Sequence, residues 1–142
     1  MIPKEKLPRH VSLIMDGNGR WAAKRGKERV CGHFEGVESV RTVVETSVEL
    51  GIEYVSFFAF SEENWGRPSD EVNTLMELMC SAMKNELQTF LDNGTRFVVL
   101  GNRARLSGSL NAMIDNMMAA TSGGHSTTVV LFLSYSGRWD IL

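Results

Sequence analysis

Four short stretches of the chain are apolar and rich in β-branched or aromatic residues. Each is bounded by Gly, Asn, Asp or Ser, a pattern typical of buried strands. They cover Val11 to Met15, Tyr54 to Phe60, Phe97 to Leu100 and Thr128 to Leu133. Between them, apolar residues recur at the spacing of one helix face. The pattern therefore predicts strands that alternate with helices.

Three longer segments carry the helical pattern. We expect Ser69 to cap the second of them, and Asp70 and Glu71 to complement the positive end of that helix. Glycines supply the stop signals after the first two. The segments run from Val37 to Leu50, from Ser69 to the turn at Asp92–Gly94, and from Leu110 to Ala120.

Strands that alternate with crossover helices predict an α/β fold, with a mainly parallel sheet flanked by helices on both faces. The length of 142 residues fits one domain, so we expect residues 1–142 to form a single α/β domain. Such sheets bind ligands beyond the carboxyl ends of their strands. The final residues, LSYSGRWDIL, run from a strand into a first helical turn and then stop. This ending predicts that the domain is incomplete and the chain a fragment.

Composition narrows the possible partners. Hydrophobic residues make up 43% and charged residues 23%, as in soluble globular proteins, and the formal net charge is -2. That charge argues against a general nucleic-acid binder, which normally carries a basic excess. The basic residues instead gather locally and predict a site for a small anion. The local group is Arg20, Lys24, Arg25, Lys27 and Arg29.

Cysteine content and hydropathy indicate the compartment. Two cysteines are too few for a disulfide framework, and MIPKEKLPRH has no apolar core of the kind that a secretory signal requires. The longest apolar stretches fall far below the roughly 20 residues that cross a bilayer. We therefore expect a cytoplasmic protein with no membrane span. The absence of a membrane span is compatible with a lipid substrate, because an internal groove can hold a prenyl chain.

The segment MDGNGRW lies where the first strand gives way to a helix. Gly17 and Gly19 let backbone amides approach a ligand, and the helix start favours phosphate oxygens. Arg20 and Arg29 add planar donors. Asp16 would repel an anion that arrived alone, but Mg²⁺ held between the carboxylate and a phosphate removes the conflict. In the alternative interpretation, Asp16 caps the helix and the glycines only form a tight turn.

A second polar group, FSEENWGR, directly follows another strand. Ser61, Asn64 and Arg67 should reach the same edge of the sheet as the first group and supply hydroxyl, amide and guanidinium groups. The alternative is a polar loop with Trp65 as its packing anchor. His33 can donate to a phosphate, or it can be a capping or partly buried side chain.

The predicted long helix has a methionine-rich face. Met76, Met79 and Met83 suit an adaptable apolar wall for a flexible chain. Ordinary core packing explains them equally well. A cavity along these residues would favour the lipid groove.

These motifs, taken together, resemble the cis-prenyltransferases, the undecaprenyl diphosphate synthase family, over nearly the whole chain. The matching segments are HVSLIMDGNGRWA, GHFEGVESVR, FAFSEENWGRP and LSYSGR. The resemblance implies a Mg²⁺-dependent enzyme that condenses isopentenyl diphosphate with an allylic diphosphate such as farnesyl diphosphate. Each condensation makes a cis double bond and yields a polyprenyl diphosphate such as undecaprenyl diphosphate. It further implies a homodimer in the full-length form and delivery of the product to a membrane, by a cytoplasmic or membrane-peripheral protein.

The resemblance also assigns roles by matching position. Asp16 would be the metal-linked carboxylate that assists departure of the allylic diphosphate, and Asn64 would act near the proton removed from isopentenyl diphosphate. The remaining matched residues would bind or shape the substrate site. They are Gly17, Asn18, Gly19, Arg20, Trp21, Arg29 and His33 from the first two motifs, and Ser61, Glu62, Glu63, Trp65 and Arg67 from the third.

The chain departs from the family pattern in sequence and in length. Ser136 stands where many members have Gly, and Glu62 where Thr or Ser is common. The family normally continues for roughly another hundred residues, a domain-scale addition. By resemblance, that part carries the isopentenyl diphosphate site, a later Glu for Mg²⁺ and most of the dimer interface. A non-catalytic module that binds an allylic diphosphate is therefore the alternative. A phosphohydrolase with Asp16 as its nucleophile is a weaker alternative, because Asn18 stands where a second Asp is usual.

Overall fold

A computed structural model describes residues 2–142. Its four strands form one sheet in the order β1-β2-β4-β3, and every neighbouring pair is parallel. The carboxyl ends of the strands therefore share one edge of the sheet. The strands are β1 (His10–Ile14), β2 (Tyr54–Ser61), β3 (Arg96–Leu100) and β4 (Thr128–Tyr135). The predicted parallel sheet is confirmed, and each strand lies within two residues of its predicted position.

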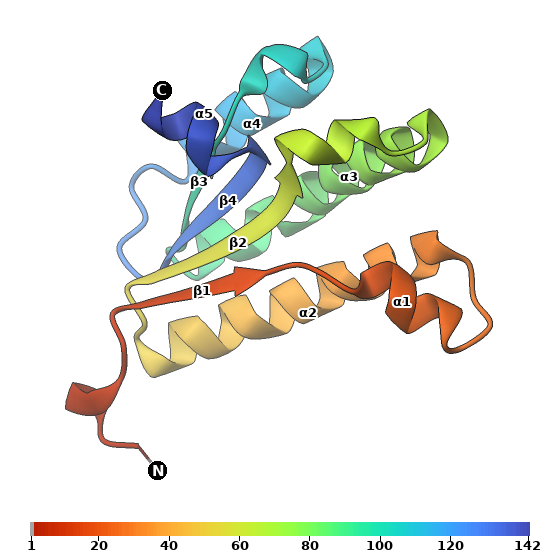
Figure 1. The fold of residues 1–142 in the computed structure, drawn as a ribbon. Helices are drawn as coiled ribbons and strands as arrows, with labels where there is room; N and C mark the ends of the chain where they lie inside the picture. The colour runs from red at the N-terminus through yellow and green to blue at the C-terminus, as the bar shows by residue number, and fades with distance from the viewer. Residues whose placement is uncertain (1) are drawn as a thin grey trace.

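Helices follow each strand and flank the sheet (Figure 1). The long helices α2 and α3 lie side by side against the sheet, and α4 packs beside α3 and against β3. Three 3₁₀ turns complete the order: η1 (Lys4–Lys6), η2 (Glu62–Gly66) and η3 (Arg103–Arg105). The helices are α1 (Asn18–Ala23), α2 (Arg29–Leu50), α3 (Ser69–Asp92), α4 (Gly108–Ala120) and α5 (Gly137–Ile141).

The start of α2 and the cap of α3 differ from prediction. Helix α2 begins at Arg29, before the predicted start at Val37. The pattern missed its first turns because they lack an apolar period. The predicted cap of α3 at Ser69 is wrong: Pro68 occupies the N-cap position, and no side chain caps the helix. Proline fixes the backbone angle there, so Ser69 is already helical.

One face of the sheet and the helices form the core. The register aligns Leu13, Phe57 and Leu131 across three strands on the covered face. These side chains pack into the same apolar cluster as Val44 of α2 and Met83 of α3. The strand positions between them point to the opposite face.

That opposite face is largely open to solvent over residues 2–142. Ile14 is 78% exposed, and Tyr54 and Leu100 are close to half exposed. The aromatic rings of Phe58 and Phe132 stack across the middle of this face. Both long helices therefore cover the same side of the sheet, where the cavity described below lies, and the prediction of helices on both faces is wrong for these two helices.

Candidate functional site

A cavity of about 250 Å³ lies between α2, α3 and the covered face of the sheet. Its wall follows successive turns of α2, from His33 through Val37 and Val44 to Val48. Phe57 of β2 and Met83 of α3 close the sides. The cavity is therefore apolar along most of its length, and polar side chains gather where α2 begins.

Two predicted elements deliver the polar end of the cavity. Asp16 follows β1, and Asn64 and Arg67 follow β2, as expected for neighbouring parallel strands. All three line the cavity. The prediction that both loops reach the same edge of the sheet is therefore confirmed by their positions.

The turn from β1 into α1 depends on Gly17. This residue is the N-cap of α1 and has a φ of +89°, which residues other than glycine rarely adopt. Because Gly17 occupies the cap, Asp16 does not cap the helix, and that alternative interpretation is wrong. The Asp16 carboxylate instead accepts a hydrogen bond of 3.0 Å from Arg20 Nη2. Asp16 and Arg20 are both more than two-thirds exposed, so they are open to a ligand.

Close packing between α1 and α2 places Arg29 at the polar end of the cavity, which we call the mouth. A Cβ on Gly32 would lie 1.9 Å from the carbonyl oxygen of Asn18, so α2 approaches the α1 backbone as closely as glycine allows. A Cβ on Gly19 would meet the Arg29 guanidinium at 2.6 Å. Because Gly19 and Gly32 lack a Cβ, the first turns of α2 and the Arg29 guanidinium can lie directly against α1.

Glu71 of α3 connects three cationic or donor side chains. Its Oε1 lies 3.3 Å from Arg29 Nη2, 3.4 Å from His33 Nε2 and 3.7 Å from Arg67 Nη1. His33 is almost completely buried, and this burial lowers its pKa despite the opposing effect of Glu71. Burial by itself would raise the pKa of Glu71. The hydrogen bond from His33 and the charges of Arg29 and Arg67 outweigh it and hold that pKa below its usual value.

The mouth keeps an excess of positive charge. Arg20, Arg29 and Arg67 carry three guanidinium groups, whereas Asp16 and Glu71 supply two carboxylates. A neutral His33 does not change this balance. The apolar cavity thus ends in donors suited to an anion with several oxygens.

Local hydrogen bonds fix the second loop. Asn64 Oδ1 accepts from the Ser61 amide at 3.0 Å, and Ser61 Oγ accepts from the Asn64 amide at 3.2 Å. This reciprocal capping holds Asn64 at the cavity. The Ser61 side chain stabilises η2 and does not line the cavity.

Two residues of this loop point to a different network. Ser134 Oγ accepts from Trp65 Nε1 at 2.9 Å and donates to Glu62 Oε1 at 3.0 Å. Arg105 lies over the Trp65 ring. Ser134 is fully buried with a φ of +54°, a strained conformation for serine. Trp65 thus has the anchoring position that the alternative interpretation describes.

The predicted site residues therefore divide into two groups. Trp21 packs with Arg25 and Lys27, and Glu63 is exposed. With Ser61, Glu62 and Trp65, these two side chains lie outside the cavity wall. The wall contains Asp16, Gly17, Asn18, Gly19, Arg20, Arg29, His33, Asn64 and Arg67.

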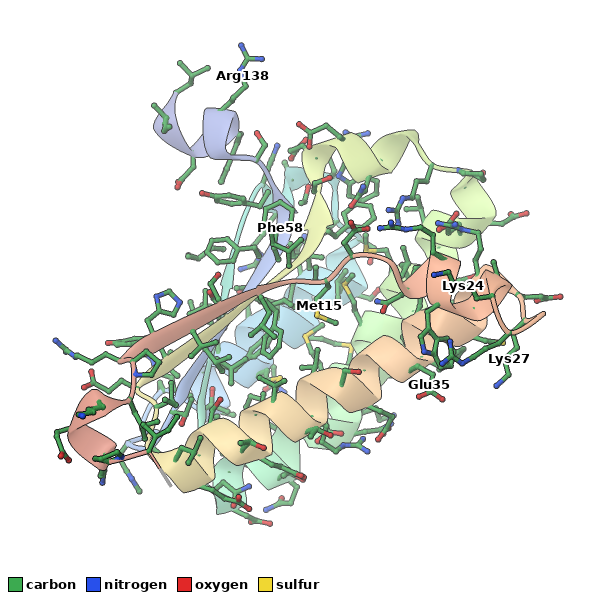
Figure 2. The ribbon with its side chains drawn as sticks, turned by 60° about the horizontal axis from the view of Figure 1, so that its bottom comes forward. Met15, Lys24, Lys27, Glu35, Phe58 and Arg138 are labelled. Atoms are coloured by element: carbon green, nitrogen blue, oxygen red, sulfur yellow. The ribbon has the colours of Figure 1, made fainter. Side chains whose placement is uncertain are left out.

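Only part of the basic segment and part of the methionine-rich face line the cavity. Figure 2 shows Lys24 and Lys27 at the turn that joins α1 to α2, outside the cavity wall. Met79 and Met83 line the cavity, whereas Met76 packs against the core. The condition set for a lipid groove is met by two of the three methionines.

Sequence reasoning assigned Glu71 only to the positive end of α3. Two of its partners, Arg29 and His33, lie 42 and 38 positions away along the chain, so no local spacing signals those contacts. Within residues 2–142, no group of three or more His, Cys, Asp or Glu side chains is placed to hold a metal ion. No helix in that range is long and apolar enough to cross a membrane.

Comparison with known proteins gives concordant results. An isoprenyl transferase from Chromobacterium violaceum is 46% identical over 135 residues, which cover 95% of this chain and 54% of that protein. A ditrans,polycis-undecaprenyl-diphosphate synthase, (2E,6E)-farnesyl-diphosphate specific, from Pseudomonas aeruginosa is 45% identical over 96% of this chain and 54% of that protein. The chain thus spans about half the length of the curated relatives it matches.

A solved structure agrees. Lavandulyl diphosphate synthase from Lavandula x intermedia, in complex with dimethylallyl diphosphate, has a TM-score of 0.90 and 27% sequence identity. The match covers 94% of this chain and 58% of that one. A family model described as putative undecaprenyl diphosphate synthase matches residues 14–142. The parallel sheet, the glycine-dependent mouth and the sequence matches agree, and the chain belongs to the undecaprenyl diphosphate synthase family of prenyltransferases.

Proposed function

We propose that this chain carries the allylic diphosphate site of a cis-prenyltransferase, which condenses isopentenyl diphosphate with an allylic diphosphate such as farnesyl diphosphate. The observation that carries the proposal is the continuity of the cavity. A guanidinium-rich mouth leads directly into an apolar wall built from α2, α3 and the sheet. This combination matches a ligand with a charged head and a hydrocarbon tail.

The mouth suits cleavage of an allylic C–O bond. As that bond breaks, negative charge develops on the leaving diphosphate, and Arg20, Arg29 and Arg67 are placed to stabilise it. Asn64 is held at the wall by its capping bonds and is assigned to the step in which isopentenyl diphosphate loses a proton. The apolar wall excludes water from the reacting chain.

Asp16 is the candidate residue for Mg²⁺. It is a single exposed carboxylate at the mouth, and Mg²⁺ is usually bound by one or two carboxylates together with substrate phosphates. This donor set fits an ion shared with the diphosphate. When bound, Mg²⁺ would neutralise charge on the leaving group, while Arg20 holds the Asp16 carboxylate in place.

A cytoplasmic location stays a prediction from cysteine content and hydropathy, and homodimer formation and delivery of the product to a membrane stay predictions from the resemblance. The same holds for the isopentenyl diphosphate site, which the family resemblance places outside residues 1–142.

The test is incorporation of radiolabelled isopentenyl diphosphate into prenyl products by the full-length form of the protein, with farnesyl diphosphate and Mg²⁺. We expect Asp16→Ala to lower turnover by at least about a hundredfold, because charge stabilisation at a leaving group is commonly that large. The melting temperature should stay unchanged, since Asp16 is exposed and caps no helix. Asp70→Asn, an exposed carboxylate at the start of α3, is the matched control. Binding of farnesyl diphosphate without turnover would instead indicate a non-catalytic binding module.

A further inference from the structure

Glu71 is surrounded by more donors than one carboxylate oxygen can bind well. Arg29, His33 and Arg67 all converge on Oε1, at 3.3 to 3.7 Å. Charged hydrogen bonds of good geometry are about 2.7–2.9 Å long. All three contacts exceed that length, so the carboxylate only partly satisfies the group around it.

The three donors face the cavity, but Glu71 does not line it. Its side chain is 18% exposed and contacts the donors from the α3 side. A diphosphate that entered from the cavity would bring several oxygens to the same donors. The carboxylate and the ligand would therefore interact with the same donors from two sides.

We propose that Glu71 is a positioning residue that holds Arg29, His33 and Arg67 at the mouth and competes with diphosphate for them, which limits the affinity for released pyrophosphate. The inference rests on the diphosphate site of the proposed function. A mouth with three guanidinium groups would otherwise retain a multiply charged product. The Glu71 carboxylate offers Arg29, His33 and Arg67 an alternative partner as the product leaves.

The direction in which one substitution changes the affinity for pyrophosphate separates this role from a purely structural one. Glu71→Gln removes the charge but keeps an acceptor oxygen of the same reach. If Glu71 only supported the fold, the variant would bind pyrophosphate equally well or less well. If Glu71 competes with the ligand, loss of its charge strengthens the attraction of the cations for the ligand.

The experiment is calorimetric titration of inorganic pyrophosphate into the wild-type protein, Glu71→Gln and Asp70→Asn, at one ionic strength and one Mg²⁺ concentration. We expect about tenfold tighter binding by Glu71→Gln, as for loss of a nearby like charge. Asp70→Asn is the matched control, because the neighbouring carboxylate forms no ion pair within the described part of the chain. Its affinity should equal that of the wild type.

The outcomes distinguish the two proposals. Wild-type protein that binds neither pyrophosphate nor farnesyl diphosphate would overturn the diphosphate site, and the role of Glu71 with it. Wild-type protein that binds pyrophosphate, beside a Glu71→Gln variant of equal or weaker affinity, would overturn the competing role alone.

A second measurement needs no variant. Bound pyrophosphate draws the three donors away from Glu71 and adds negative charge nearby. The pKa of the Glu71 carboxyl, followed by its ¹³C chemical shift in the wild-type protein, should therefore rise when pyrophosphate is present. An unchanged pKa would contradict the proposal, even if Glu71→Gln failed to fold.

Discussion

His33 and Glu71 show how the site depends on single residues. His33 lies in the early turns of α2 and is almost completely buried, whereas Glu71 lies in the first turn of α3. Neither role is visible in the local sequence, because the contact joins positions 38 residues apart. Burial shifts the protonation of His33 in a direction that has a measurable effect on stability.

We expect His33 to make the folded state less stable in acid. Its pKa in the folded protein is lowered from the usual value of 6.5, chiefly by burial. The unfolded chain therefore binds a proton at His33 as the pH falls through 6.5, before the folded protein does. This contribution to stability is fully present above pH 6.5 and is lost as the pH falls below it.

Urea denaturation at pH 8 and at pH 5.5 checks this expectation. His33→Gln keeps a hydrogen-bond donor but does not titrate, so its midpoint should fall less between the two pH values than that of the wild type. Glu71 affects only a lower range, since its pKa is held below 4.5. An equal fall in both proteins would contradict a buried, neutral His33.

The contact between α1 and α2 is the element on which the geometry of the mouth depends. Gly32 meets the backbone of Asn18, and Gly36 meets its side-chain amide. The loop that begins at Asp16 leads directly into α1, so a displaced α1 would move Asp16 and Arg20 together. The close approach of two helices thus sets the position of the proposed metal-linked carboxylate.

We expect Gly32→Ala to separate these two helices. A Cβ at 1.9 Å from a carbonyl oxygen requires the backbone to shift, and overpacking of this kind costs about 1–3 kcal/mol. The melting temperature should fall, and pyrophosphate affinity should fall with it. Gly108→Ala is the control, because nothing lies within 4 Å of its Cβ. A Gly32→Ala variant as stable as Gly108→Ala would contradict the close approach.

Element positions were predictable where one physical signal dominated. The strands followed from short apolar runs, and Gly51 at a φ of +74° ends α2 as predicted. The start of α2 could not be predicted, because Arg29 to Gly36 lacks an apolar period and is held by α1. The sequence placed Asp16 correctly at the polar end of the cavity. It could not show that Arg20 donates a hydrogen bond to Asp16, because an arginine at that position is equally expected to bind a ligand.

At the scale of the whole molecule, the parallel sheet brings two distant loops to one end of one cavity. The sequence predicted that edge because strand direction and loop position follow from the alternation of strands and helices. It could not predict which side chains turn inward. Trp65 and Glu62 turn toward Ser134 because a buried, left-handed serine provides partners for both. Side-chain direction thus depends on packing between β4 and the second loop.

The proposed function requires one cavity to bind both a diphosphate head and a prenyl tail. Its most direct test is the ratio of calorimetric affinities for farnesyl diphosphate and dimethylallyl diphosphate, which share a head group and differ in tail length. Burial of four further methylene-sized groups, at about 0.8 kcal/mol each, already corresponds to more than about a hundredfold. We predict that farnesyl diphosphate binds at least that much tighter. Equal affinities would contradict this function, because the apolar wall would then contribute nothing to binding.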